Sequence, residues 1–89
     1  MPQAQYRVNL NNGNYTIADY AWVEHRLLIF IDGTSEKLHG NPQTAQMDKL
    51  KRIQAEMQNW KVIAITYQEL FDEPVMALRL QQIESYLRS

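Results

Sequence analysis

Two short apolar runs, separated by a segment with helical periodicity, set the strongest limit on the fold of this chain. Residues 27–31 and 62–65 are rich in branched aliphatic side chains and present no polar face. Such runs are typical of strands that are covered on both sides. A strand, a helix of about 17 residues and a second strand therefore predict a parallel pair joined by a crossover helix, which should be right-handed.

The segment between the two runs carries apolar side chains at helical spacing. This spacing predicts an amphipathic helix over about 42–58 that packs its apolar stripe on the sheet. Asn41 and Pro42 supply an N-cap and a first-turn proline. The opposite face is charged and amide-rich, as in a solvated helix. The residues of the stripe are Met47, Leu50, Ile53, Met57 and Trp60.

The first third of the chain predicts a hairpin followed by a central strand. Residues 6–10 alternate in polarity, residues 15–22 form a second strand, and Asn12-Gly13 between them favours a tight turn. In the second strand we expect Tyr15, Ile17 and Asp19 to share one face. A third strand, 26–32, is apolar on both faces and should lie inside the sheet.

The last third predicts one strand and two helices. The strand is 61–66, and Thr66 with Glu69 forms a capping-box pattern for a short helix. A final helix opens near Asp72 and Pro74. The predicted fold is α/β, a mixed four-stranded sheet in the order β-β-β-α-β-α-α with helices on its faces. The predicted buried stripe of the last helix is Met76, Leu80, Ile83 and Leu87.

Composition limits the classes of function. Eighty-nine residues suit one domain, 1–89. Nine Lys and Arg against ten Asp and Glu give a formal charge of −1, so any binding to nucleic acid must come from a local patch. The chain has no Cys, which excludes disulfides and thiolate zinc sites and suits the cytoplasm, its expected location. No apolar run approaches the roughly 18 residues of a membrane span.

Residues 19–33 resemble the core of the very-short-patch repair endonucleases and of nuclease-like domains at the C-termini of large bacterial helicases. In that pattern an Asp closes one strand, an acidic residue lies in the turn, and the next strand ends as Phe30-Ile31-Asp32-Gly33 does here. Asp48, then Lys51 or Arg52, then Asn59-Trp60 continue the order downstream. The chain is thereby similar, over nearly its whole length, to the restriction-endonuclease-like (PD-(D/E)xK) superfamily.

The resemblance implies a Mg²⁺-dependent site for cleaving DNA. Asp19 would anchor the ion, Asp32 would be a second ligand or handle the proton of the attacking water, and the Ile31 carbonyl would be a further ligand. Hard divalent ions prefer such oxygen ligands and polarise the phosphoryl group. His39 is the candidate for a further catalytic or phosphate-contacting group. The candidates for contacts with the DNA backbone are Lys37, Lys49 and Arg52.

Several parts of the family pattern are missing. Phe30 stands where many relatives have Glu, Asp32 stands where the repair enzymes have His, and the third strand has no Lys. The helix that precedes the first strand in the family is absent, which indicates a fragment of a longer protein. We therefore expect a DNA-binding, nuclease-like accessory domain of a bacterial helicase or of a DNA repair or defence protein. Its site would be degenerate and inactive in isolation, with Mg²⁺ as cofactor only if it is active.

A protein-interaction or regulatory module is the alternative, because a fold does not fix a function. A phage-type inhibitor would be a variant of this reading. Asp-Gly is a common turn pair, and Lys49, Arg52 and Glu56 also suit an ordinary solvated helix face. Trp22, beside a turn, is the aromatic residue expected to meet a partner. The expected partners are thus DNA and a helicase or other protein, and no membrane.

Overall fold

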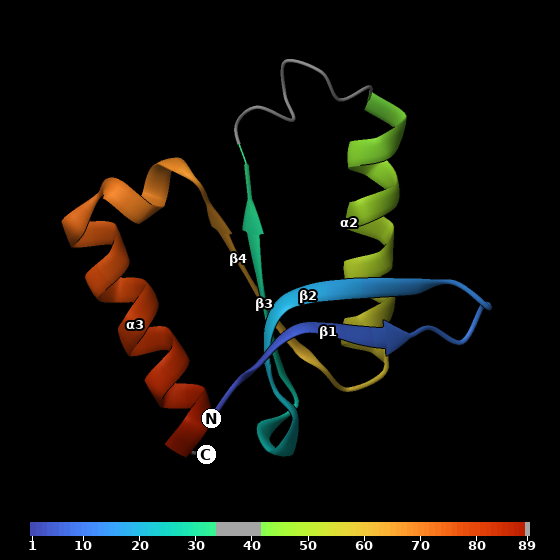
Figure 1. Ribbon diagram of the computed structural model, residues 1–89, viewed down its shortest axis with the longest axis horizontal. Coiled ribbons are helices and arrows are strands. Elements are labelled where there is room, and N and C mark those ends of the chain that lie inside the picture. The colour runs from blue at the N-terminus through green and yellow to red at the C-terminus, as the bar shows by residue number, and fades with distance from the viewer. Residues whose placement is uncertain (34–41, 89) are drawn as a thin grey trace.

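The computed structural model describes residues 1–33 and 42–88, which form a four-stranded sheet with a helix on each face (Figure 1). A 3₁₀ helix, Val23–His25, links β2 to β3, and a second one, Gln68–Phe71, precedes α3. The strands and α-helices are β1 Gln3–Asn9, β2 Tyr15–Trp22, β3 Leu27–Asp32, α2 Pro42–Met57, β4 Lys61–Thr66 and α3 Glu73–Arg88.

The sheet has the strand order β1-β2-β3-β4. β1 with β2 and β2 with β3 are antiparallel, whereas β3 and β4 are parallel in a register from Leu27 opposite Lys61 to Asp32 opposite Thr66. The predicted α/β class, mixed sheet and parallel pair are confirmed. The observed order is β-β-β-α-β-α, because the short helix predicted after Thr66 is a 3₁₀ helix. Its capping contact is present, since the Glu69 N–H donates to Thr66 Oγ1 at 3.2 Å.

The core consists of two clusters that share β3. Leu28 and Phe30 point into a cluster on the α2 side, and Leu27 and Ile29 point into a cluster on the α3 side. Leu27 and Leu28 are both fully buried. A strand with two buried faces must be apolar at every position, so the prediction that β3 lies inside the sheet is confirmed.

β2 changes face at Asp19. Ala18 and Ala21 lie three residues apart, an odd number, yet both are fully buried in the α2-side cluster. The change coincides with Gln5 in β1, which has a φ of 52° and, like Asp19, takes no part in the regular pairing of the two strands. The strict alternation predicted along β2 therefore breaks between Ala18 and Ala21, because a period of two fails across a kinked pair of strands.

The kink separates the first half of β2 from β3. Pairing of β2 with β3 covers Tyr20, Ala21 and Trp22 alone. Before Tyr20, the β1–β2 hairpin turns away from β3 and runs past the lower part of α2 (Figure 1). The space between the departing β2, the end of β3 and α2 becomes a groove.

α2 packs on the sheet with the side opposite to the one predicted. The predicted buried residues Met47, Leu50, Ile53 and Met57 are 43% to 78% exposed, while Ala55 is fully buried. The small Ala55 side chain lets the helix backbone approach the sheet closely, and the more apolar face is left outside. Trp60, just after the helix, is buried as predicted.

α3 follows its prediction more closely. Met76, Ile83 and Leu87 pack against the α3-side cluster together with Tyr86. Leu80 is 53% exposed, so its assignment to the buried stripe is wrong. The stripe is completed by Tyr86, whose ring lies one helical turn beyond Ile83.

Arg26 fixes the end of α2 to the start of β3. Its φ of 52° ends the first 3₁₀ helix in a left-handed conformation. Its guanidinium donates to the carbonyls of Gln58 at 2.6 Å and Asn59 at 3.2 Å. It also stacks over Trp60, 4.2 Å from the ring centroid. Carbonyls at a helix end lack donors within the helix, and the Arg26 guanidinium is the donor for two of them here.

Candidate functional site

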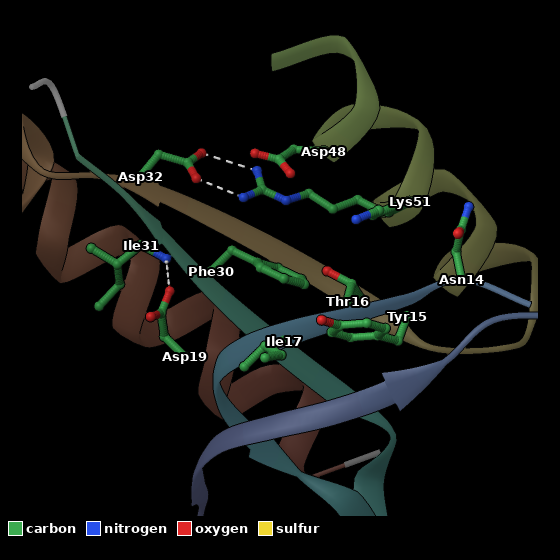
Figure 2. Close-up of a pocket in the computed structure, with 11 residues that line it drawn as sticks. Asn14, Tyr15, Thr16, Ile17, Asp19, Phe30, Ile31, Asp32, Asp48 and Lys51 are labelled. Atoms are coloured by element: carbon green, nitrogen blue, oxygen red, sulfur yellow. Dashed lines mark hydrogen bonds and ion pairs between the residues drawn. The ribbon is translucent and has the colours of Figure 1, made fainter. Parts of the chain in front are cut away.

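A groove opens where β2 leaves β3, with α2 as its third wall (Figure 2). The hairpin contributes residues 14–17 and Asp19, and β3 contributes residues 30–32. From α2 come Asp48, Lys51 and Arg52. Asp19 and Asp32, predicted to be neighbours, therefore do line the same groove. The floor is polar, with carboxylates from all three walls.

Asp19 accepts a hydrogen bond from the backbone of β3. Its Oδ2 accepts the Ile31 N–H at 2.6 Å, and its Oδ1 lies 3.4 Å from the Gln5 side-chain nitrogen. Ile31 lies beyond the last residue of β3 that pairs with β2, so its N–H has no strand partner on that side. The carboxylate replaces that partner. This contact gives the half-buried Asp19 a structural role, because a strand N–H without a strand partner needs another acceptor.

Asp32 is held by Arg52. The two guanidinium nitrogens donate to the two carboxylate oxygens at 2.6 and 3.0 Å, and the guanidinium stacks on the Phe30 ring at 4.3 Å. Burial lowers the pKa of Arg52. The hydrogen bonds and charge of Asp32, with the charges of Asp48 and Asp19, outweigh that effect and leave this pKa raised. Arg52 is therefore a permanent cation at the centre of the groove.

These contacts decide how well the residues fit a metal ion. Among residues 1–33 and 42–88, no three His, Asp or Glu side chains come together as a metal site would require. A Mg²⁺ ion shared by Asp19 and Asp32 would have to displace the Arg52 guanidinium, which occupies both oxygens of Asp32, and at Asp19 it would compete with the Ile31 N–H for Oδ2. The donors do not fit a metal ion in this arrangement. The assignment of Asp19, Asp32 and the Ile31 carbonyl as ligands stays a prediction.

Of the predicted DNA-contacting residues that the structure describes, Arg52 lines the groove and Lys49 does not. Lys37 and the predicted catalytic residue His39 lie outside the described residues. Lys49 is exposed on α2 and does not line the groove. Arg52 lines it, but its charge is matched by Asp32.

Another basic group gathers around Tyr15, a groove-lining residue of the hairpin. The Arg7 guanidinium stacks over the Tyr15 ring, 4.0 Å from its centroid, and Lys51 Nζ lies 5.8 Å from the same centroid. Sequence reasoning missed Arg7 and Tyr15, although a signal existed. An Asn-Gly hairpin places Asn9 opposite Tyr15 and Arg7 opposite Ile17, so Arg7 and Tyr15 are diagonal neighbours on one face. Lys51 is brought there by the orientation of α2, for which no such signal exists.

Comparison with family models, with curated proteins and with solved structures finds no match for this chain. No helix in the described part of the chain has the length and hydrophobicity needed to cross a membrane. The function therefore has to be inferred from the groove and the surfaces around it.

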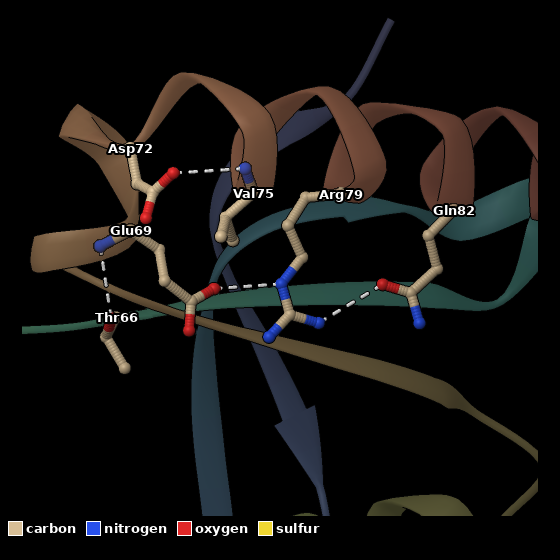
Figure 3. A network of polar contacts seen from close by, with 6 residues as sticks. All are labelled: Thr66, Glu69, Asp72, Val75, Arg79 and Gln82. Atoms are coloured by element: carbon tan, nitrogen blue, oxygen red, sulfur yellow. Dashed lines mark hydrogen bonds and ion pairs between the residues drawn. The ribbon is translucent and has the colours of Figure 1, made fainter.

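A second ion pair lies outside the groove, where the last 3₁₀ helix meets α3 (Figure 3). Arg79 Nε donates to Glu69 Oε1 at 2.9 Å, and Arg79 Nη1 donates to Gln82 Oε1 at 3.2 Å. The hydrogen bond from Arg79 is the main cause that lowers the pKa of Glu69 below its ordinary value of 4.5. The pair thus ties the second turn of α3 to the 3₁₀ helix that follows β4.

The lowered pKa of Glu69 predicts a pH-dependent contribution to stability. Such a group stabilises the fold fully above its unfolded-state pKa, near 4.5, and loses this effect as the pH falls through the folded-state value. We expect part of the acid-induced fall in the urea midpoint below that pH to disappear in Glu69→Gln. Arg79→Gln, which removes the donor, should flatten the profile in the same way. A wild-type pH profile in both variants would contradict the assignment.

Proposed function

We propose that this protein is a DNA-binding, nuclease-like accessory domain with a restriction-endonuclease-like core, and that it binds DNA without cleaving it. The observation that carries the proposal is the group formed by Arg7, Tyr15 and Lys51 beside a groove in which Asp19 and Asp32 are already engaged. The sheet order and the place of the groove also suit the resemblance found in the sequence. A bacterial helicase, or another DNA repair or defence protein in the cytoplasm, is the setting this resemblance suggests.

The Arg7–Tyr15–Lys51 group has the properties of a phosphate-binding surface. Of the ion pairs within residues 1–33 and 42–88, none involves Arg7 or Lys51. Arg7 is oriented by neutral partners, the Tyr15 ring and the Asn9 side-chain oxygen at 3.1 Å, so its charge remains available. Two oriented cations can contact neighbouring phosphates, and a half-exposed tyrosine can stack on a base or sugar.

The engaged carboxylates support binding without cleavage. Phosphodiester hydrolysis by this kind of site needs acidic side chains that are free to hold a divalent ion. Here Asp19 accepts a backbone N–H and Asp32 is bound by both arms of Arg52. Supercoiled plasmid should therefore stay intact with Mg²⁺ or Mn²⁺, for the wild type and for Asp19→Ala alike. Nicking by the wild type that is lost in Asp19→Ala would refute the non-cleaving part of the proposal and leave the binding part standing.

Variants of the Arg7–Tyr15–Lys51 group test whether the protein binds DNA through these residues. We expect Arg7→Ala and Lys51→Ala each to weaken binding to a short duplex about 3- to 10-fold, measured by fluorescence anisotropy at low salt. The double variant should lower the slope of log affinity against log salt by about 2, one unit for each lost phosphate contact. Lys61→Ala with Arg88→Ala removes the same charge elsewhere and should bind like the wild type. Equal losses in both double variants, or no binding at low salt, would contradict the proposal.

A protein-interaction or regulatory module, including a phage-type inhibitor, remains the second candidate. The apolar outer face of α2 favours it, because large apolar side chains gathered on one exposed face are typical of interfaces. Trp22, the residue expected to meet a partner, is half-buried and packs against the α3-side cluster instead. Association with a protein that is insensitive to Arg7→Ala and Lys51→Ala would favour this candidate.

A further inference from the structure

The face of α2 that points away from the sheet has the pattern of a helix–helix interface. Gln46, Leu50, Ile53 and Met57 follow one another at spacings of four, three and four residues, and all four are exposed. This spacing forms one continuous stripe, and it is the spacing of paired helices in a coiled coil. Ala55, which is buried against the sheet, lies on the opposite side of the helix. We call these four residues the outer stripe.

The residues that flank the outer stripe differ between its two sides. Lys49 and Glu56 are seven residues apart, so they lie on the same side of the stripe, two helical turns from each other. Met47 and Gln54 lie on the other side, with the same separation. One border thus carries a positive charge near the middle of α2 and a negative charge near its end, and the other border is uncharged.

We propose that two copies of this chain associate through the outer stripe, with their α2 helices antiparallel. Leu50 of each copy would then pack against Ile53 of the other copy. An antiparallel pair brings like borders together, so Lys49 of each copy faces Glu56 of the other and the interface contains two such charge pairs. A parallel pair would place Lys49 opposite the uncharged Gln54. The complementarity of this border with itself selects a second copy, antiparallel, as the occupant.

The proposed dimer is independent of the proposed function. Lys51 and Arg52 lie on the sheet side of α2, so pairing through the outer stripe leaves the groove of each copy open. A single pair of 16-residue helices makes a small interface. Its dissociation constant should therefore lie in the micromolar range, about 1 to 100 µM, and the protein should be monomeric in dilute solution.

Sedimentation over protein concentrations from about 1 to 500 µM tests the dimer. The wild type should shift from monomer to dimer across this range. Leu50→Glu, which places a charge at the centre of the interface, should weaken association at least about 100-fold. The matched control is Leu78→Glu on α3, where the leucine is 66% exposed, and it should dimerise like the wild type. A wild type that stays monomeric throughout, or a dimer that survives Leu50→Glu, would overturn the proposal.

A charge exchange tests the antiparallel arrangement. Lys49→Glu and Glu56→Lys should each weaken the dimer about 10-fold, because each places like charges together at both ends of the interface. The double variant Lys49→Glu with Glu56→Lys restores both pairs in the opposite sense and should regain wild-type affinity. Single variants without effect, or a double variant weaker than either single one, would rule out this arrangement. Circular dichroism of each variant should match the wild type, since both residues are exposed.

Discussion

Replacing Leu28 with alanine should lower the free energy of unfolding by about 3 kcal/mol. Leu28 is fully buried in the α2-side cluster, where it lies opposite Ala21 on β2. Removing most of its side chain loses the transfer free energy of the deleted groups and leaves a cavity. β3 is hydrogen-bonded to a strand on each side, so its backbone cannot move to fill that cavity.

Urea unfolding followed by the fluorescence of Trp22 and Trp60 would measure this loss. A domain of this size should also melt roughly 12 to 24 °C lower, at about 4 to 8 °C for each kcal/mol. The matched control is Leu78→Ala on α3, where the same atoms are removed from an exposed position and stability should change by less than about 0.5 kcal/mol. Similar losses at both positions would mean that the α2-side cluster is not packed as described.

Replacing Asp32 with alanine should have the next largest effect, a loss of about 2 kcal/mol. The Arg52 guanidinium would keep its place on the Phe30 ring and lose both hydrogen bonds to the carboxylate. The side chains of Arg52 and Asp32 are 22% and 37% exposed, so solvent screens the pair and the loss should stay well below that of a fully buried charge. Arg52→Ala should cost less, about 1 kcal/mol, because Asp32 can then turn to water.

A double-mutant cycle separates the ion pair from other effects of the two substitutions. If Asp32 and Arg52 act through each other, the double variant should be less destabilised than the sum of the two single variants, by about 1 kcal/mol. Adding salt should shrink this difference, because the pair is partly exposed. Additive losses would mean that the bidentate contact contributes nothing to stability.

The strands could be predicted because their burial leaves few alternatives. β3 and β4 are apolar on both faces, and a strand that is buried on both sides allows no other composition. Asn12-Gly13 fixed the place of the hairpin turn, where Gly13 has a φ of 88°. β2 and β4 accordingly have the predicted bounds. The kink at Asp19 could not be predicted, since it depends on Gln5 across the sheet and not on neighbours along the chain.

The orientation of α2 could not be predicted from the spacing of its apolar residues. A stripe of Met47, Leu50, Ile53 and Met57 indicates a face that avoids water, but the same stripe suits a core and a surface between molecules. The helix instead packs through Ala55, because a small residue permits a close approach to the sheet. The spacing alone cannot distinguish these two uses of an apolar face.

The candidate site was predictable in its place and not in its contacts. Asp19 lies next to the part of β2 that pairs with β3, and Asp32 is the last residue of β3, so their meeting in one groove follows from the adjacency of the two strands. The pairing of Asp32 with Arg52, 20 residues away, depends on which side of α2 faces β3. That side was assigned to solvent from the sequence, and the partner of Asp32 was missed for the same reason.

Because β3 contributes side chains to both clusters, the two clusters are coupled when the protein unfolds. Leu27 and Ile29 need α3 as cover, and Leu28 and Phe30 need α2, yet all four belong to one strand. Shortening the chain before Glu73 would expose one side of that strand and loosen the layer on the other side as well. We therefore expect the two halves of the interior to melt in one cooperative step, and neither half to fold by itself.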